Sequence, residues 1–460
     1  MRIKSMSAVI ATLTIALCSN VGAQETLDSS VSHLPGGHDI AHNTMDGSFL
    51  VAWAGENAGA GHKMEIRAHR LVPSGKVTGS MMALDMSHLM STEVAVSYGE
   101  GKYFVVWRDG RKASSVGDEV YGRMLDSSGN MLGDSFRISD LGDKGPDRSP
   151  DVTFDGESFL VVWAHRNLSP AGGGFTVSFV ENDDIRGRYV ALDGAMGEAS
   201  FAFTTEAVDS LRPSVASLSG TPLTVWEDHP GPGMSGQVWG RFTPQQAPHE
   251  TSFPYSVGTG IKKENPCIVA NPDEEQYLVL WRSEDVRDGD VLFARLATLE
   301  GKYLGKPRLL QGVSGGVHTF SAAYDATRKE YLVSWDVGLK ETAEHIRAVR
   351  LDSKNLGMKS KIQITEGETR NWGVVSDPAG EGAPLSVYLR EGEGENVELV
   401  SGRLLSAVLA GGPSSGGGGS CSASATRATP SPIPFLALSL LVVLLLFSPL
   451  IRNRSDNSSS

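Results

Sequence analysis

A short apolar strand that ends on an aromatic residue recurs along the chain, as in FLVAW, YFVVW and FLVVW. The aromatic residues that end the seven copies are Trp53, Trp107, Trp163, Trp226, Trp281, Trp335 and Tyr388. Successive copies are 54, 56, 63, 55, 54 and 53 residues apart. A nearly constant period in this range is typical of arrays whose units bury a hydrophobic face against a neighbour. The chain therefore contains seven units of one repeat.

Each unit contains more than this anchor strand. An alternating polar and apolar run precedes it and ends in a Gly-containing turn, as in TEVAVSYGEG (Thr92–Gly101). A third strand follows, as in EVYGRMLD (Glu119–Asp126), and a turn leads to a fourth, SFRIS (Ser135–Ser139). Strand-like alternation bounded by turn residues recurs throughout this region, without a helical period. Four antiparallel strands repeated seven times predict an all-β fold, a seven-bladed β-propeller over residues 25–406.

The position of each strand within a blade follows from its pattern. The anchor strand is apolar at every position, which is expected where neighbouring blades cover both faces of the sheet. Its aromatic residue has the bulk to fill the space between blades. The seventh copy lacks a fourth strand, because Leu405–Pro413 runs into a Gly-rich stretch. We expect the N-terminal segment Glu25–His33 to pair with Asn396–Ser406, which would close the ring and remove an open sheet edge.

The repeat units, which read roughly YLVVWxD followed by DIYGxRLD, resemble secreted bacterial propeller-like repeat proteins. The resemblance covers Glu25 to Ser406. It implies the propeller fold and leaves the activity open, because propellers host enzymes, ligand binders and scaffolds alike. The sequence lacks the Asp-box pattern of sialidases, the Gly-His partner of WD40 repeats and phased kelch double glycines.

The N-terminal residues 1–23 are predicted to be a secretory signal peptide. Arg2 and Lys4 form its basic start, Ala8–Leu17 its apolar middle, and Ala23 the last residue before cleavage. We therefore expect export, with the propeller outside the cell.

The C-terminal residues predict an anchor. A Gly-, Ser- and Pro-rich linker covers residues 407–432, and Ile433–Ile451 follows with 19 residues and no charge, long enough to cross a bilayer as a helix. Residues 452–460 form the predicted cytoplasmic tail. The order of spacer, Cys, apolar span and Arg tail resembles C-terminal sorting signals of bacterial surface proteins, including the myxobacterial type. That resemblance implies that Cys421 is the processing position; the alternative is a plain transmembrane anchor at the cell surface.

Composition narrows the partners. The net charge is −13, and nucleic acid is not expected because phosphate binding needs a basic surface. The three cysteines are Cys18, Cys267 and Cys421, so only Cys267 lies in the predicted propeller and no internal disulfide forms there.

Charged residues follow the anchor aromatic in most copies, and propeller geometry would place this loop at the mouth of the central channel. The ten candidate ligand-binding residues are Arg108, Asp109, His165, Arg166, Glu227, Asp228, His229, Arg282, Asp285 and Asp336. Glu227-Asp228-His229 is the densest cluster, and such groups serve as acid, base or metal ligands. No second His stands at metal-ligand spacing, so neither catalytic nor metal-binding residues are assigned, and no cofactor is expected. The extra length of the third unit lies in His165–Asp184, a place where function is often added.

Two functions remain open. The first is a monomeric, non-catalytic binding or scaffold protein whose surface ligand is a glycan or a protein. The alternative is a surface enzyme, a glycan-active hydrolase or lyase that uses loop carboxylates at the channel mouth. Two carboxylates about 5–10 Å apart across the mouth would favour the enzyme. Charges held in ion pairs would favour the binding protein.

Overall fold

The computed structural model describes residues 21–29, 37–57, 63–85, 91–111, 117–140, 145–170, 179–197, 199–205, 208–229, 236–243, 253–254, 263–285, 289–310, 317–339, 342–365, 371–377, 385–391 and 397–404. The predicted linker, membrane span and tail, together with Cys421, lie outside these residues. No helix among the described residues is long and apolar enough to cross a membrane.

The described residues form 28 strands. They are β1 (Val21–Asp28), β2 (His38–His42), β3 (Phe49–Asn57), β4 (Lys63–Leu71), β5 (Val77–Asp85), β6 (Ser91–Gly99), β7 (Lys102–Asp109), β8 (Glu119–Asp126), β9 (Met131–Arg137), β10 (Asp147–Phe154), β11 (Ser158–Pro170), β12 (Phe179–Ala191), β13 (Phe201–Ala202), β14 (Asp209–Leu218), β15 (Thr221–His229), β16 (Gln237–Phe242), β17 (Phe253–Pro254), β18 (Lys263–Asn271), β19 (Gln276–Asp285), β20 (Gly289–Thr298), β21 (Tyr303–Leu309), β22 (Val317–Asp325), β23 (Glu330–Leu339), β24 (Thr342–Asp352), β25 (Met358–Gln363), β26 (Asn371–Asp377), β27 (Leu385–Glu391) and β28 (Val397–Leu404).

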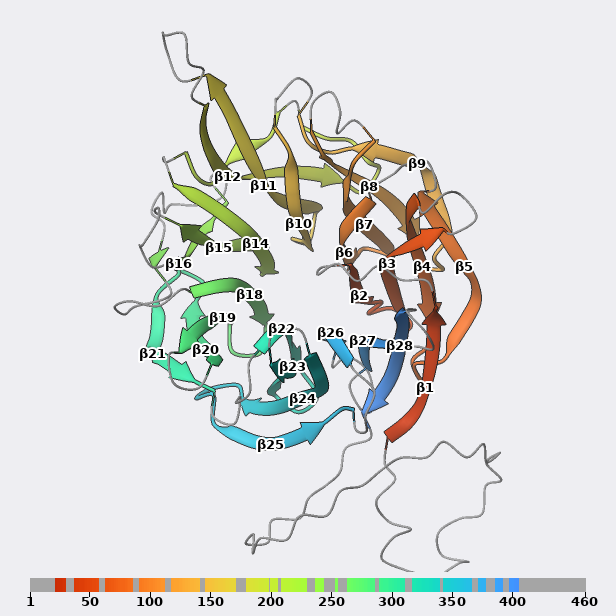
Figure 1. Cartoon of the computed structure of the whole chain (residues 1–460), viewed down its shortest axis with the longest axis vertical. Helices are drawn as coiled ribbons and strands as arrows, with labels where there is room; N and C mark the ends of the chain where they lie inside the picture. The colour runs from red at the N-terminus through yellow and green to blue at the C-terminus, as the bar shows by residue number, and fades with distance from the viewer. Residues whose placement is uncertain are drawn as a thin grey trace, which may run out of the picture. The chain divides into compact units, whose positions relative to one another are not determined.

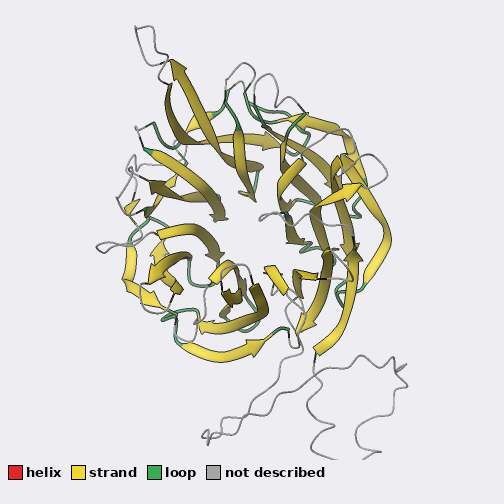
Figure 2. Cartoon of the chain, viewed as in Figure 1, coloured by secondary structure: helices red, strands yellow, loops and turns green. Residues whose placement is uncertain are grey.

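These strands form seven four-stranded antiparallel sheets, which confirms the predicted propeller. Six sheets consist of four consecutive strands, from β2-β3-β4-β5 in blade one to β22-β23-β24-β25 in blade six. The innermost strands β2, β6, β10, β14, β18, β22 and β26 contact one another in a closed cycle around the ring axis (Figure 1). The described residues contain strands, turns and loops only (Figure 2).

Blade seven takes its outermost strand from the N-terminal segment. Its strand order is β1-β28-β27-β26, so the predicted closure of the ring is confirmed. The pairing segment is Val21–Asp28 rather than Glu25–His33, and its partner is Val397–Leu404. The pairing segment therefore begins at Val21 rather than at the predicted Glu25. Its first three residues belong to the predicted signal peptide. Leu27 lies in the apolar cluster between blades seven and one, which fixes this register on the buried face.

The anchor aromatics lie between blades, as predicted. Trp53, Trp107, Trp163, Trp226, Trp281, Trp335 and Tyr388 are all at most 2% exposed. Trp163 of blade three packs in one cluster with Phe104 and Val106 of blade two. The same strand recurs in every copy because each blade presents the same packing surface to its neighbour.

Candidate functional site

The candidate residues lie on the second strands of their blades, just after the anchor aromatic. We call these ten residues the strand-end charges. The sequence placed them in loops, and this was wrong: β7 continues to Asp109, β15 to His229 and β19 to Asp285. Because each blade repeats the same strand order, these strand ends lie on one face of the ring. Backbone pairing between the strands continues past the anchor aromatic, where the charged side chains bond with residues of neighbouring strands.

In blade two, both predicted residues are held in ion pairs. Arg108 bonds with Asp118 through Nε at 2.6 Å and with Glu93 through Nη1 at 3.2 Å. Asp109 has a fully buried side chain that accepts hydrogen bonds from Arg111 at 2.8 Å and from the Trp107 indole at 2.9 Å. These bonds fix the end of the anchor strand.

In blade three, the extra length predicted within His165–Asp184 is an extension of two strands. β11 and β12 stay paired as far as Pro170 and Phe179, and this hairpin reaches beyond the ring (Figure 1). At its base, His165 Nδ1 lies 2.7 Å from an Asp147 carboxylate oxygen, and both side chains are buried. Arg166 pairs with Asp183 at 3.3 Å.

In blade four, Glu227-Asp228-His229 does bring two carboxylates beside an imidazole. Glu227 is fully buried and its Oε1 lies 2.6 Å from Arg212 and 3.0 Å from His229. The hydrogen bond to Glu227 raises the pKa of His229. Asp228 faces a different set of groups, because it accepts from the Trp226 indole and the Ser210 hydroxyl, both at 2.7 Å.

The remaining strand-end charges belong to blades five and six. Arg282 bonds with Glu264 at 2.6 Å. Asp336 is fully buried and accepts from the Thr319 amide at 2.8 Å and from its hydroxyl at 2.7 Å. Asp285 ends β19, and its side chain is not described.

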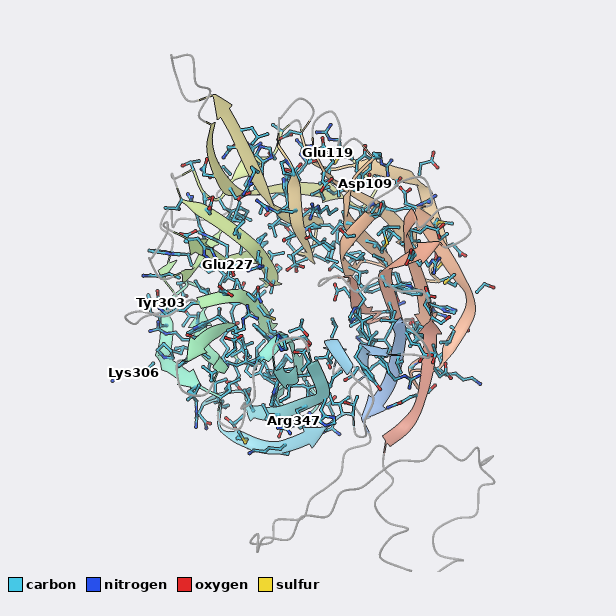
Figure 3. The ribbon with its side chains drawn as sticks, in the orientation of Figure 1. Asp109, Glu119, Glu227, Tyr303, Lys306 and Arg347 are labelled. Carbon is cyan, nitrogen blue, oxygen red and sulfur yellow. The ribbon has the colours of Figure 1, made fainter. Side chains whose placement is uncertain are left out.

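Glu227 and Glu93, the partner of Arg108, also join one blade to the next. Glu93 accepts from the Ser149 amide at 2.7 Å, and Glu227 accepts from the Asn265 amide at 2.5 Å. Ser149 and Asn265 occupy the same bulge of their innermost strands, with φ of 51° and 50°. The bulge turns their N–H groups toward the preceding blade. Asp109 and Glu227 lie in separate parts of the ring (Figure 3), so the strand-end charges do not converge on one point.

Sequence reasoning missed a second set of residues, most of them polar, which encircles the ring axis. In each blade one residue of the innermost strand pairs with the residue just before the anchor aromatic. These seven axial residues are Asp39, Ala95, Asp151, Ser214, Cys267, Ser321 and Val375. Aligning the seven copies on their aromatic anchor would have found them.

The polar axial residues also join neighbouring blades. Asp39 accepts from the Val96 amide and Asp151 from the Val215 amide, both at 2.8 Å. Ser214, Cys267 and Ser321 accept in the same way from the next innermost strand. Ala95 and Val375 carry no side-chain acceptor, so this bond recurs at five of the seven blade junctions.

Burial changes the acidity of two axial groups. It raises the pKa of Asp151 to about 6, although its carboxylate accepts from two backbone amides. It raises the pKa of the Cys267 thiol to about 12, and the charges of Asp39 and Asp151 act in the same direction. The charges of both carboxylates therefore reach the thiol. A carboxyl group that is half protonated near pH 6 has the acidity of a general acid.

A cavity of about 730 Å³ lies between blades two and three. Arg137, Arg186, Arg188, Asp140 and Asp184 line it together with serine, threonine and methionine side chains. None of these five is among the ten predicted site residues, although Asp184 ends the segment His165–Asp184 in which the sequence placed the extra length of the third unit. Within the described part of the chain, no group of His, Cys, Asp and Glu side chains is arranged to hold a metal ion.

Comparison with known proteins yields structural neighbours only. No protein-family profile and no curated protein matches the chain. A Trypanosoma rangeli sialidase in complex with sialic acid is 10% identical with a TM-score of 0.46, and the match covers 71% of this chain and 55% of the sialidase. The chain thus matches little more than half of that protein.

Two further solved structures are similar at the same level. A subtype N10 neuraminidase-like protein of a little yellow-shouldered bat strain is 13% identical, with a TM-score of 0.42 and coverage of 68% and 95%. A thermostable family-43 glycoside hydrolase is 11% identical, with a TM-score of 0.38 and coverage of 60% and 95%. Likeness at these scores assigns no function to this chain.

Proposed function

We propose that this protein is an exported propeller that binds a glycan at the cell surface without transforming it. The observation that carries the proposal is the pairing of the strand-end charges. Nine of the ten have described partners in ion pairs or hydrogen bonds, and the tenth, Asp285, has no described side chain. Charged groups held in this way support blade packing rather than proton transfer.

A binding function also needs a concave surface with groups that remain able to contact a ligand. The cavity between blades two and three has the volume of a small-molecule site, which is commonly about 300–1,000 Å³. Charged and hydroxyl groups line it, and polar groups of this kind orient a ligand such as a sugar.

The test is binding to a glycan array with the full-length chain, followed by product analysis of each bound glycan by mass spectrometry. We expect one class of glycan to be retained and to be recovered intact. Recovery of shortened glycans or of glycans with a new double bond would contradict the non-catalytic proposal. Retention of no glycan would contradict glycan binding itself.

A second candidate, a glycan-active hydrolase, is favoured by one observation. Asp39 and Asp151 are both axial residues whose charges act on Cys267, and burial raises the pKa of Asp151 to about 6. Glycosidases use a carboxylic acid of raised pKa as general acid together with a second carboxylate. If product analysis detects cleavage, Asp151→Asn should abolish it while the melting curve stays cooperative.

A further inference from the structure

The outermost strands of blades five and six gather positive charge on the outside of an acidic protein. The basic residues are Lys306 and Arg308 on β21 and Lys359 and Lys361 on β25, and all four are exposed. Neither strand contains a carboxylate, although the whole chain has a net charge of −13. Figure 3 shows Lys306 at the outer margin of the ring. We call these two strands the basic rim.

The outermost strands of the other blades have the opposite charge. Their charged residues are Glu25, Asp28, Asp85, Asp134 and Arg137. Four of these five are acids, and the arginine is paired with Glu119 at 2.7 Å. The described strands β13 and β17 are two residues long and carry no charge. The described outermost strands therefore carry unneutralised positive charge in blades five and six only.

The repeat does not require a lysine at this place. The outermost strands of blades one, two and five share a bulge at a glycine, where the strand shifts its register. The bulge glycines are Gly79, Gly133 and Gly305, with φ of 76°, 74° and 83°. Lysines and bulges both protect open sheet edges from pairing with other chains. The residue after the glycine is Ser80 in blade one and Asp134 in blade two, so the same bulged edge exists without the lysine that blade five has at position 306.

Most of this positive charge is not neutralised within the protein. No described residue forms an ion pair with Lys306 or Lys361. Arg308 donates from Nη1 to the backbone carbonyl of Asn355, which joins β21 to the turn before β25 and leaves the guanidinium charge in place. Lys359 lies 3.0 Å from Asp352. Four cations and one carboxylate leave a formal charge of +3 on the basic rim.

The same two strands also expose apolar side chains. Leu304 and Leu309 on β21 are both 44% exposed, and Met358 on β25 is 37% exposed. Cations pair with the phosphates of lipid headgroups, and apolar side chains beside them enter the boundary between headgroups and acyl chains. A free anion or a soluble polyanion would neutralise the charge but leave these apolar side chains in water. An anionic bilayer accommodates both features.

The path of the chain agrees with this arrangement. β28 ends at Leu404 in blade seven, and blade seven contacts blade six through β26 and β22 (Figure 1). The predicted linker 407–432 and the predicted span Ile433–Ile451 follow from there. A tether to the bilayer raises the effective concentration of the surface beside it, so that a weak attraction is enough for docking.

We propose that the basic rim docks on a membrane surface that contains anionic lipids. Its four cations pair with lipid phosphates, and Leu304, Leu309 and Met358 enter the headgroup boundary. The ring then stands with its outer edge against the bilayer. This inference goes beyond glycan binding and does not depend on it, because the cavity between blades two and three is a different part of the ring.

The test is hydrogen–deuterium exchange with mass spectrometry on the full-length chain mixed with lipid vesicles. One set of vesicles is phosphatidylcholine alone, which is neutral, and the other also contains anionic phosphatidylglycerol. We expect slower exchange in β21 and β25 with the anionic vesicles only. The internal control is β9, an outermost strand with exposed apolar residues, where exchange should stay the same. Protection should disappear at about 1 M salt, where the screening length falls to about 3 Å.

Two variants measure the contributions of charge and of apolar contact. Lys306→Ser introduces the residue of blade one and should lower the docking constant about fivefold, the contribution of one lysine near an anionic surface. Its control is Lys76→Ser, an exposed lysine between β4 and β5, which should have no effect. Leu304→Ser should lower the constant about three- to tenfold through lost apolar burial. Its control is Leu132→Ser, the equivalent residue of blade two, which is 40% exposed.

Equal protection of β21 and β25 by neutral and anionic vesicles would overturn the proposal, as would equal docking by the Lys306→Ser and Lys76→Ser variants. Unchanged docking of Leu304→Ser would point to a soluble polyanion and would overturn docking on a bilayer. Protection that rises with protein concentration in the absence of vesicles would identify a second copy of the chain as the partner instead. None of these outcomes changes retention on the glycan array, so failure here is distinct from failure of the proposed function.

Discussion

Asp28 is the residue through which the N-terminal strand closes the ring. It lies at the end of β1, and its Oδ2 accepts from the Trp53 indole at 2.7 Å and from Arg67 Nη1 at 2.6 Å. Trp53 and Arg67 belong to blade one, whereas β1 belongs to blade seven. One carboxylate thus joins the added strand to the next blade. Asp28→Ala should therefore weaken the packing of β1 against blade one and destabilise the fold.

The size of the effect follows from burial. The side chains of Asp28 and Arg67 are only 8% and 9% exposed, so the pair is a buried one. Removing one partner of a buried ion pair destabilises a protein by about 3–5 kcal/mol. Glu65 stays 3.3 Å from Arg67 and still compensates its charge, which moves the expectation to the lower end. The lost indole bond adds about 1 kcal/mol, so we expect a loss of about 3–4 kcal/mol.

Urea denaturation followed by tryptophan fluorescence measures this loss. The matched control is Thr26→Ala, two residues away on the same strand, where the side chain is exposed and accepts one long hydrogen bond from Arg390 at 3.3 Å. That variant should change stability by at most about 0.5 kcal/mol. If Asp28→Ala proved as harmless as Thr26→Ala, the closing strand would not contribute to stability through this contact, and the argument would be wrong.

Three further predictions concern the core, the ring axis and the anchor. Trp163→Ala should cost about 3–5 kcal/mol, whereas Arg166→Ala, at a partly exposed ion pair, should cost less than about 1 kcal/mol in the same denaturation assay. Asp151 has a higher pKa folded than unfolded, so its contribution to stability should fall as pH rises from about 4 to about 6. Melting temperatures across this range should show a slope that Asp151→Asn removes; an unchanged slope would rule out Asp151 as its source. Truncation before Ile433 should release the propeller into the medium, and a truncated protein found with the cells would contradict the anchor.

The sequence predicted the fold because the signal for the fold is repeated. Seven aromatic residues at a nearly constant spacing each end an apolar strand. One unit cannot bury such a surface alone, so the pattern predicts that like units pack against one another. Closure was predictable from the missing fourth strand of the last copy. The register of the closing strand was not, since Val21–Asp28 and Glu25–His33 both offer a short alternating segment. The buried contacts of Leu27 and Asp28 with blade one determine the choice.

The charges after the anchor have partners within the ring that the sequence did not indicate. A polar residue at a strand end has two uses, binding a ligand or bonding to a neighbouring blade, and its own sequence does not distinguish them. Glu227 illustrates the point: its partners Arg212 and Asn265 lie 15 and 38 residues away, in the innermost strands of two blades. Only the ring brings these groups together. The buried Asp109 and Asp336 are explained in the same way.

The cavity shows how function is added to such a ring. Comparing equivalent positions in the seven blades identifies the residues that the repeat itself requires. Arg188 is one of them, because it bonds to the preceding blade as Arg123 and Arg241 do. Arg186 shares its position with Arg67 and Arg347 of blades one and six, so the remainder is Arg137, on the outermost strand of blade two. A repeat that fixes packing at every junction leaves single positions free to vary without loss of the fold. A specific site in this protein is therefore expected where one junction departs from its equivalents, and blades two and three form such a junction.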